Sequence, residues 1–226
     1  MSFMLIAGVE EAGRGPVIGP LVMAIACIDE KDEFKLKTLG VKDSKLLLPG
    51  QRERLYPAIK ELCIFDTVRI RPEEIDMAVD PESDTNLNWL EADKTAMLIN
   101  KMNKKMNKKM KPDKVFLDCP STNILAYKNY ILKKLDYKPE LVVEHKADVK
   151  YVIVGAASIL AKVMRDNEIK KLKVKHGVDF GSGYPSDPVT IAFVRKNFDK
   201  YPFFRKTWET WKAAKRLAEQ RRIRDF

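Results

Sequence analysis

The chain alternates between short apolar runs and longer stretches in which apolar residues recur at helical spacing. Short runs that are apolar throughout or at every second position, and that end at Gly, Pro or charged residues, predict β-strands. Such strands are expected at residues 3–9, 20–28, 65–70, 114–118 and 140–144. Helices are expected between and after them, at residues 31–40, 48–63, 72–77, 87–110, 122–135, 151–176, 188–200 and 204–222.

The order of these elements predicts an α/β fold with one mixed five-stranded sheet, helices on its faces and a helical appendage at the C-terminus. The first two strands are joined by Gly13-Arg14-Gly15-Pro16, and Pro16 and Pro20 flank a β-branched segment. A dinucleotide-binding loop would open directly into a helix, whereas this glycine-rich segment leads into a second strand. The segment therefore predicts a β-hairpin and argues against a nucleotide cofactor.

Acidic residues follow three of the expected strands. Glu10 and Glu11 come after the first strand, Asp118 ends the fourth, and Asp148 lies just past the fifth. In an open α/β sheet, ligand chemistry collects beyond the carboxyl ends of the strands. Four carboxylates favour a site for one or two Mg²⁺ or Mn²⁺ ions. For the Glu10-Glu11 pair taken alone, the alternative interpretation is a solvated turn.

Composition removes several other classes of site. His145 and His176 are the only histidines, which argues against His-rich metal sites and against nucleophilic catalysis with a histidine base. Cys27, Cys63 and Cys119 are odd in number and widely spaced, so neither a disulfide framework nor a zinc site is indicated. No apolar run approaches the roughly 18–20 residues that span a membrane, and no secretory signal is recognisable. We therefore expect a cytoplasmic protein.

The formal net charge of +10 is concentrated in two stretches. Residues 101–114 carry seven lysines against Asp113, and residues 199–226 carry nine Lys or Arg against four acids. Concentrated basic surface on an otherwise balanced chain suggests a polyanionic partner, most plausibly nucleic acid. The alternative is a solvated, lysine-rich helix face.

Several longer motifs identify a family that the chain resembles. They are Glu11–Pro20 (EAGRGPVIGP), Asp43-Ser44-Lys45, His145–Asp148 (HKAD), Ala156–Val163 (AASILAKV) and Gly181–Pro188 (GSGYPSDP). With these motifs in this order, the chain resembles the type 2 ribonucleases H, that is, ribonuclease HII of archaea and bacteria and its eukaryotic counterpart. The Gly181–Pro188 loop and the compact C-terminal helices resemble the archaeal form.

The resemblance implies a ribonuclease H-like catalytic domain at residues 1–187, a helical extension at 188–219 and a clamp-binding tail at 220–226. It also implies a metal-dependent endonuclease that cuts the RNA strand of RNA–DNA hybrids. A further implied activity is cleavage of duplex DNA on the 5′ side of an embedded ribonucleotide, by a two-metal mechanism, in replication and repair. Nothing in the sequence demands a partner subunit, so we expect a monomer.

The resemblance assigns site residues to positions of this chain. The catalytic metal ligands fall on Glu10, Glu11, Asp118 and Asp148. Ribonucleotide recognition falls on Gly13, Arg14, Gly15 and Tyr184. Glycines let backbone amides approach a ribose 2′-hydroxyl closely, and this hydroxyl distinguishes RNA from DNA. Lys45 is expected to contact phosphate; its alternative is an exposed surface charge.

One position departs from the family pattern, because Glu10 stands where the family has aspartate. The extra methylene moves the carboxylate, and a misplacement of about 1 Å can cost on the order of a hundredfold in rate. We hypothesise a metal site that is detuned or retuned toward Mn²⁺. The rival hypothesis is a non-catalytic nucleic-acid-binding homologue. A third, a resolvase of the same fold, is disfavoured by the Gly13-Arg14-Gly15 motif and Tyr184.

The C-terminus carries a separate short motif. Gln220, Ile223 and Phe226 resemble the sliding-clamp-binding peptide, in which an aliphatic residue and then an aromatic residue follow glutamine at intervals of three. A tail at the end of a chain is free to dock on a partner. The alternative is an ordinary basic helix end.

Overall fold

The strands form one mixed sheet in the computed structural model, which describes residues 4–42, 44–106 and 111–224, without the side chains of Lys45 and residues 221–224. The strand order is β3-β2-β1-β4-β5. The strands are β1 (Leu5–Ala12), β2 (Leu21–Asp29), β3 (Ile64–Ile70), β4 (Lys114–Asp118) and β5 (Glu140–Glu144). β1 pairs antiparallel with β2 and parallel with β4, and β4 pairs parallel with β5. The predicted mixed sheet and its opening hairpin are confirmed.

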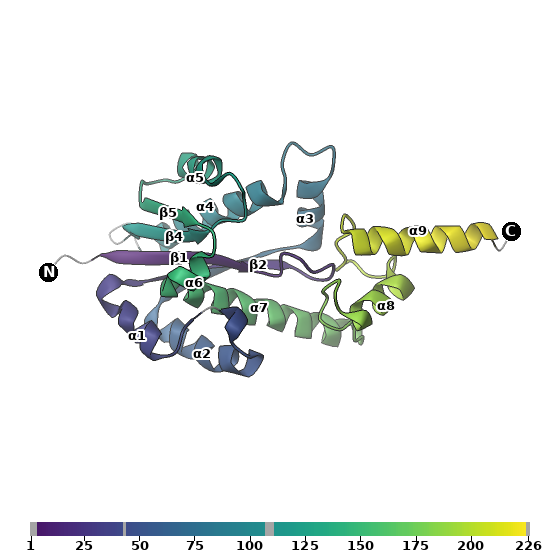
Figure 1. Cartoon of the computed structure of the whole chain (residues 1–226), viewed down its shortest axis with the longest axis horizontal. Helices are drawn as coiled ribbons and strands as arrows, with labels where there is room; N and C mark the ends of the chain where they lie inside the picture. Colours follow the sequence, from purple (N-terminus) through teal and green to yellow (C-terminus); the bar gives the residue numbers. More distant parts are fainter. Residues whose placement is uncertain (1–3, 43, 107–110, 225–226) are drawn as a thin grey trace. The chain divides into compact units, whose positions relative to one another are not determined.

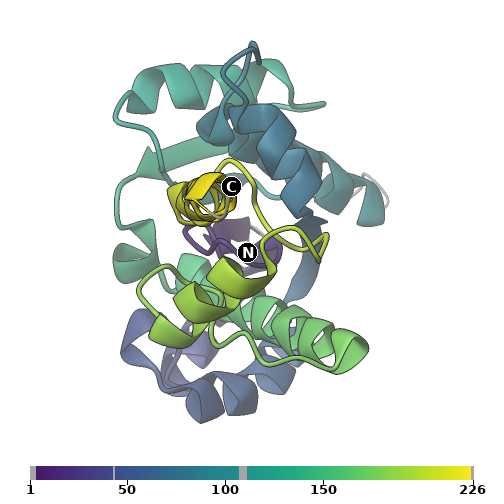
Figure 2. The same ribbon diagram turned by 90° about the vertical axis from the view of Figure 1, so that its right-hand side faces the viewer.

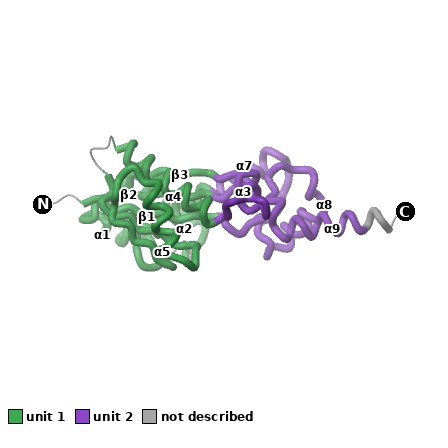
Figure 3. The backbone as a smooth tube through the Cα atoms, turned by 90° about the horizontal axis from the view of Figure 1, so that it is seen from above, with its two compact units in different colours: residues 1–12, 22–69, 88–164 green, residues 13–21, 70–87, 165–226 purple. Residues whose placement is uncertain are grey.

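The residues group into two compact units, shown in Figure 3. Unit 1 comprises residues 1–12, 22–69 and 88–164, and it contains nearly all of the sheet. Unit 2 comprises residues 13–21, 70–87 and 165–226. The predicted segment boundaries after residues 187 and 219 stay predictions.

In unit 1 the sheet lies between two layers of helices (Figures 1 and 2). One face is covered by α1 (Glu33–Thr38), α2 (Pro49–Leu62) and the first part of α7 (Val152–His176). The other face is covered by α4 (Leu87–Lys105) and α5 (Ile124–Lys133). The helix α7 approaches β1 so closely that a Cβ on Gly8 would lie 2.5 Å from the backbone of Ile153. Only glycine allows this contact, which brings the start of α7 onto the central strand.

Three short helices complete unit 1, and they are η1 (Glu30–Asp32), η2 (Ser44–Leu46) and α6 (Ala147–Lys150). None of the helices in the described ranges is long and apolar enough to span a membrane.

The strand β1 is longer than the sequence predicted. Its antiparallel ladder with β2 continues through Glu10↔Ala24 and Glu11↔Met23 to Ala12↔Val22. The expected end at Val9 is therefore wrong for the hairpin, and it is the parallel ladder with β4 that stops there. The long apolar strand β2 supplies backbone partners beyond that point, so Glu10 and Glu11 lie within a strand and not in a turn.

Unit 2 consists of α3 (Pro72–Val79), the second part of α7, α8 (Pro188–Asn197), α9 (Glu209–Arg224) and the segment of residues 13–21. Its core is an apolar cluster that includes Val17, Ile18, Ile169, Phe180 and Phe204. The segment between the two strands of the hairpin is thus an integral part of a second hydrophobic core.

The last two helices differ from the prediction at their boundaries. The helix α8 ends at Asn197, and α9 begins at Glu209 where a start at residue 204 was expected. Residues 203–208 instead pair with the segment of residues 13–21, where Gly19 N donates to Phe203 O at 2.9 Å and Arg205 N donates to Val17 O at 2.9 Å. These non-local hydrogen bonds compete with helix formation and fix residues 203–208 in an irregular conformation.

Candidate active site

The four predicted metal ligands come from adjacent elements of unit 1. Asp118 is the last residue of β4, and Asp148 lies on α6 shortly after β5. Because β1, β4 and β5 are parallel, their carboxyl ends meet at one edge of the sheet. Glu10 and Glu11 belong to the part of β1 that continues beyond its ladder with β4 at this edge. The structure therefore brings all four carboxylates to one place.

The carboxyl group of Glu10 is influenced by the charges of the other three acids. Glu10 is 5% exposed, and its burial raises the pKa of its carboxyl well above the ordinary value. The negative charges of Glu11, Asp118 and Asp148 raise this pKa further. A buried carboxylate among three others needs either a proton or a cation to balance its charge.

The turn between β5 and α6 is fastened to the end of β4. Asp118 Oδ1 accepts a hydrogen bond from Ala147 N at 2.9 Å. His145 Nδ1 lies 2.9 Å from Cys119 O, and Cys119 N donates to Glu144 O at 3.0 Å. These contacts hold Asp118 and the start of α6 together and place Asp148 next to the end of β4.

The donor set fits a hard divalent cation. Glu10 Oε2 is buried and accepts no hydrogen bond, which leaves one ligand oxygen of the cluster without a partner. Carboxylate oxygens are the ligands that Mg²⁺ and Mn²⁺ prefer. Within the described ranges, no three His, Cys, Asp or Glu side chains are arranged to hold an ion together.

The Gly-Arg-Gly segment begins unit 2. Gly13 has φ +85°, and a Cβ there would lie 2.9 Å from Pro20 O, so the position requires glycine. Gly15 is exposed, and a Cβ built on it would lie 3.9 Å from Tyr184 Cε1. The structure thus brings two predicted recognition residues, Gly15 and Tyr184, side by side. Arg14 between the two glycines is half-buried.

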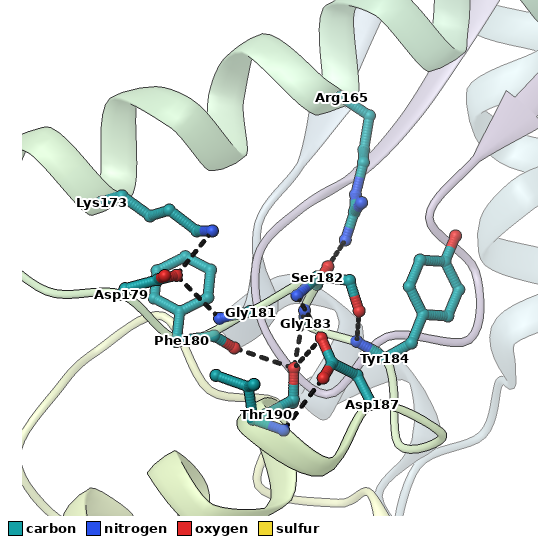
Figure 4. Close-up of polar contacts among 11 residues, drawn as sticks. Arg165, Lys173, Asp179, Phe180, Gly181, Ser182, Gly183, Tyr184, Asp187 and Thr190 are labelled. Carbon is teal, nitrogen blue, oxygen red and sulfur yellow. Dashed lines mark hydrogen bonds and ion pairs between the residues drawn. The ribbon is translucent and has the colours of Figure 1, made fainter. Parts of the chain in front are cut away.

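Tyr184 lies on the loop that connects α7 to α8, shown in Figure 4. It is 37% exposed, and its ring lies beside the guanidinium of Arg165, whose Cζ is 5.0 Å from the ring centroid. Arg165 Nη2 also donates to Ser182 O at 2.9 Å. The backbone of this loop is tied to the Gly-Arg-Gly segment, because Val17 N donates to Gly183 O at 2.9 Å.

Asp187 and Thr190 close the same loop from its other end (Figure 4). Asp187 Oδ2 accepts from Ser182 N at 2.6 Å, and Asp187 Oδ1 accepts from Val189 N at 2.9 Å as the N-cap of α8. Hydrogen bonds from Ser182 lower the pKa of Asp187 to about 2. Thr190 Oγ1 donates to Phe180 O at 2.8 Å and accepts from Gly183 N at 2.9 Å. The loop is therefore preorganised by buried and capped polar groups.

The remaining predicted residues are only partly described. Lys45 lies on η2, whose neighbour Ser44 is buried with its Oγ 2.8 Å from Ser158 Oγ on α7. Its side chain lies outside the described part, and its phosphate contact stays a prediction. In the tail, Gln220 and the backbone of Ile223 belong to α9, whereas Phe226 lies outside the described residues.

Residues that position the candidate site were missed by the sequence analysis. Arg165, Arg205 and Trp208 all contact the two recognition segments in unit 2. No local pattern separates two structural arginines from the other basic residues, since the chain has 42 Lys and Arg. Asp187 had a usable signal, because an aspartate directly before Pro188 is typical of a helix start.

Comparisons with known proteins agree with this geometry. The sequence model of the family described as Ribonuclease HII matches residues 7–211. Ribonuclease HII of Pyrococcus horikoshii is 45% identical over 212 residues, which cover 92% of this chain and 91% of the relative. Ribonuclease HII of Methanococcus maripaludis is 43% identical over 97% of this chain and 90% of the relative.

Solved structures show the same relationship. The crystal structure of ribonuclease H2 from Pyrococcus horikoshii OT3 matches with a TM-score of 0.85 and 43% identity, over 96% of this chain and 99% of that one. A PCNA:RNase HII complex from Archaeoglobus fulgidus matches with a TM-score of 0.79 and 35% identity, over 91% and 96%. Bst-RNase HIII, 22% identical with a TM-score of 0.74 in its complex with Mn²⁺, shares the fold.

Proposed function

The chain belongs to the ribonuclease HII family of metal-dependent endoribonucleases, and on that premise we propose that it cuts both RNA–DNA hybrids and duplex DNA at embedded ribonucleotides. The observation that carries the second activity is the pairing of exposed Gly15 with the ring of Tyr184. A backbone without a side chain beside an aromatic ring suits a single sugar whose 2′-hydroxyl must be recognised. The four-carboxylate edge supplies the hydrolytic chemistry.

Glu10, Glu11, Asp118 and Asp148 would hold one or two Mg²⁺ or Mn²⁺ ions. Such ions, when bound, supply Lewis-acid activation of water and stabilise the leaving oxygen. The oxygen of water would bond to phosphorus as the phosphorus–O3′ bond on the 5′ side of the ribonucleotide breaks, and the leaving O3′ would take up a proton, which gives a 3′-hydroxyl and a 5′-phosphate. The burial of Glu10 shields one side of the cluster from bulk water.

Recognition of the ribonucleotide is assigned to Gly13, Arg14, Gly15 and Tyr184. The Gly15 amide can donate to the 2′-hydroxyl, and Tyr184 can stack on the sugar and hydrogen-bond the same group. Arg165 and Asp187 support Tyr184 from behind, so the loop holds its shape before substrate arrives. Preorganisation of this kind lowers the entropic cost of binding.

The basic stretch at residues 101–114 contributes less to this proposal than its charge suggested. Lys101 pairs with Asp66 at 3.1 Å, and Lys114 pairs with Glu140 at 2.8 Å. Lys105 donates to Phe65 O at 2.8 Å. These contacts favour the alternative of a solvated helix face, although exposed pairs of this kind are weak. Lys45 remains our proposed phosphate contact.

The C-terminal tail is proposed to bind a sliding clamp. The relative from Archaeoglobus fulgidus has been solved as a complex with PCNA, and Gln220, Ile223 and Phe226 have the spacing of a clamp-binding peptide. Pull-down with the clamp before and after deletion of residues 220–226 tests this. Unchanged binding after the deletion would overturn the assignment. A monomer in a cytoplasmic setting stays our expectation.

One assay separates the proposed activities from the rival of a non-catalytic homologue. Three duplexes of one sequence are compared in Mg²⁺, Mn²⁺ and EDTA: an RNA–DNA hybrid, a DNA duplex with one ribonucleotide, and an all-DNA duplex. We expect metal-dependent cutting of the first two and none of the third. Binding of all three without cutting supports the rival. Cutting of an all-DNA junction, assayed beside the three duplexes, supports a resolvase.

A further inference from the structure

A short segment of unit 2, residues 203–208, which we call the strap, donates hydrogen bonds to the carbonyl groups of the Gly-Arg-Gly turn. Arg205 donates through Nη2 to Gly13 O at 2.6 Å, through Nη1 to Arg14 O at 2.7 Å and through Nε to Gly19 O at 3.1 Å. Trp208 Nε1 donates to Gly15 O at 3.0 Å. Two side chains therefore hold the carbonyl oxygens of the peptide bonds before and after Gly15, which are those of Arg14 and of Gly15 itself.

The burial of Arg205 shows that these contacts are specific. Its side chain is 0% exposed, and its Cζ lies 4.9 Å from the ring centroid of Trp208. A buried guanidinium is tolerated only when acceptors replace its lost hydration. The planar fork of arginine can reach three carbonyls at once, whereas the single ammonium of lysine cannot match this geometry.

Fixed carbonyls also fix the direction of the backbone amides. A trans peptide unit is planar, so the N–H of one residue points opposite to the C=O of the residue before it. Because Arg205 holds the carbonyl of Arg14, the N–H of Gly15 points away from Arg205. Gly15 is exposed and adjoins the ring of Tyr184, so this amide lies where a ribose would be recognised.

We propose that Arg205 and Trp208 are positioning residues for ribonucleotide selection: Arg205 orients the Gly15 amide through the carbonyl of Arg14, and Trp208 fixes the following peptide plane through the carbonyl of Gly15. The inference rests on the proposed recognition of a 2′-hydroxyl by this turn. The strap thereby has a function, although its residues 204–208 were predicted to start a helix of the C-terminal extension. Asp76 anchors the strap further, since it accepts from Lys206 N at 2.8 Å and from Thr207 N at 3.0 Å.

The test uses the full chain and the variants Arg205→Lys and Trp208→Phe, with Phe203→Leu as the matched control. Phe203 is buried in the aromatic cluster of the same strap, but its side chain donates to none of the turn carbonyls. Spectra of ¹⁵N-glycine-labelled protein report on all ten glycines, among which Gly50 and Gly177 lie in open surroundings and serve as references. Duplex binding is measured with Ca²⁺ as the added ion, for a ribonucleotide and for a deoxynucleotide at one position.

We expect Arg205→Lys and Trp208→Phe to shift the Gly15 resonance and leave those of Gly50 and Gly177 in place. The ratio of deoxynucleotide to ribonucleotide Kd should fall severalfold in both variants, and kcat/KM for the ribonucleotide duplex by about a hundredfold in Arg205→Lys. Phe203→Leu should lower Tm but keep the Kd ratio of the wild type. If the wild type bound the ribonucleotide and deoxynucleotide duplexes with equal Kd, the proposed function itself would be contradicted. A selective wild type with equally selective Arg205 and Trp208 variants would overturn the positioning inference alone.

Discussion

The guanidinium of Arg165 lies against the ring of Tyr184, with 5.0 Å between Cζ and the ring centroid, and it holds the loop beneath that ring through Ser182 O. Arg165 is buried, and its Nε makes no hydrogen bond. Burying a cation costs free energy unless polar or aromatic contacts replace its lost hydration. The arginine therefore sets the orientation of an exposed tyrosine, which is the side chain assigned to the sugar.

Replacing Arg165 should therefore impair ribonucleotide cleavage through Tyr184. We expect Arg165→Lys to lower kcat/KM on a single-ribonucleotide duplex by about tenfold, because a shift of the ring below 1 Å already weakens alignment. In a Tyr184→Ala background the same change should have little further effect. Steady-state kinetics of the two single variants and the double variant measure this coupling.

Lys173→Met is the matched control for this cycle, since Lys173 contacts the start of the same loop, through exposed Asp179 and the ring of Phe180. It should change kcat/KM by less than about twofold. Fully additive effects of Arg165→Lys and Tyr184→Ala would show that Arg165 acts independently of the tyrosine.

Asp187 should stabilise unit 2 in a pH-dependent way. Its pKa is lowered to about 2 by hydrogen bonds from Ser182, whereas an unfolded aspartate titrates near 3.9. Its ionised form therefore contributes stability above about pH 4, and this contribution is lost as the pH falls toward 2. Asp187→Asn should lower Tm at pH 7, and the difference from wild type should narrow steadily between pH 5 and pH 2.5. A difference that stays constant over this range would contradict the assignment.

The extra methylene of Glu10 should be visible in metal preference. Glu10→Asp shortens the side chain to the length usual in the family, and we expect kcat with Mg²⁺ to rise by up to about a hundredfold relative to that with Mn²⁺. Rates in both ions for the wild type and Glu10→Asp measure this. Unchanged kcat and an unchanged preference for the ion would mean that the site already accommodates glutamate without loss.

The three cysteines should react only slowly with thiol reagents in the native protein. Cys27 and Cys63 are buried, and burial raises the pKa of both thiols to about 12. Burial also raises the pKa of Cys119, which is free as well. Because the thiolate is the reactive form, a thiol reagent at pH 8 should label none of them quickly, and all three after denaturation. Rapid labelling of one native equivalent would show that a core region opens.

Most of the fold could be predicted from the sequence because its signals are local. Apolar runs located all five strands, and the glycine and proline residues around Pro16 correctly excluded a strand-to-helix turn. The end of β1 could not be predicted, because it depends on the length of its partner β2. Two acids in succession look like the start of a turn unless the neighbouring strand is known.

Within the candidate site, the carboxylates and Tyr184 were predicted from the sequence, whereas the arginines that position the recognition segments were not. The carboxylates stand out because each follows an apolar strand, and Tyr184 belongs to a long motif. Arg165 and Arg205 make their contacts with residues distant along the chain, and Arg205 reaches Gly13 across 192 positions. Such contacts leave no periodic or local pattern. The residues that hold the site in place were therefore visible only in the structure.

The central claim is that the four carboxylates support metal-dependent cleavage at a ribonucleotide. The most direct measurement is single-turnover cleavage of a DNA duplex with one ribonucleotide by the wild type and Asp118→Asn, with Mg²⁺ or Mn²⁺ and with EDTA. Asparagine can still accept the hydrogen bond from Ala147 N, so the fold at the end of β4 should persist. We predict one cut on the 5′ side of the ribonucleotide by the wild type with either ion, none with EDTA, and at least a hundredfold slower cleavage by Asp118→Asn, roughly the loss expected for a misaligned site. Cleavage by Asp118→Asn at the wild-type rate, or binding by the wild type without cleavage in either ion, would contradict the account.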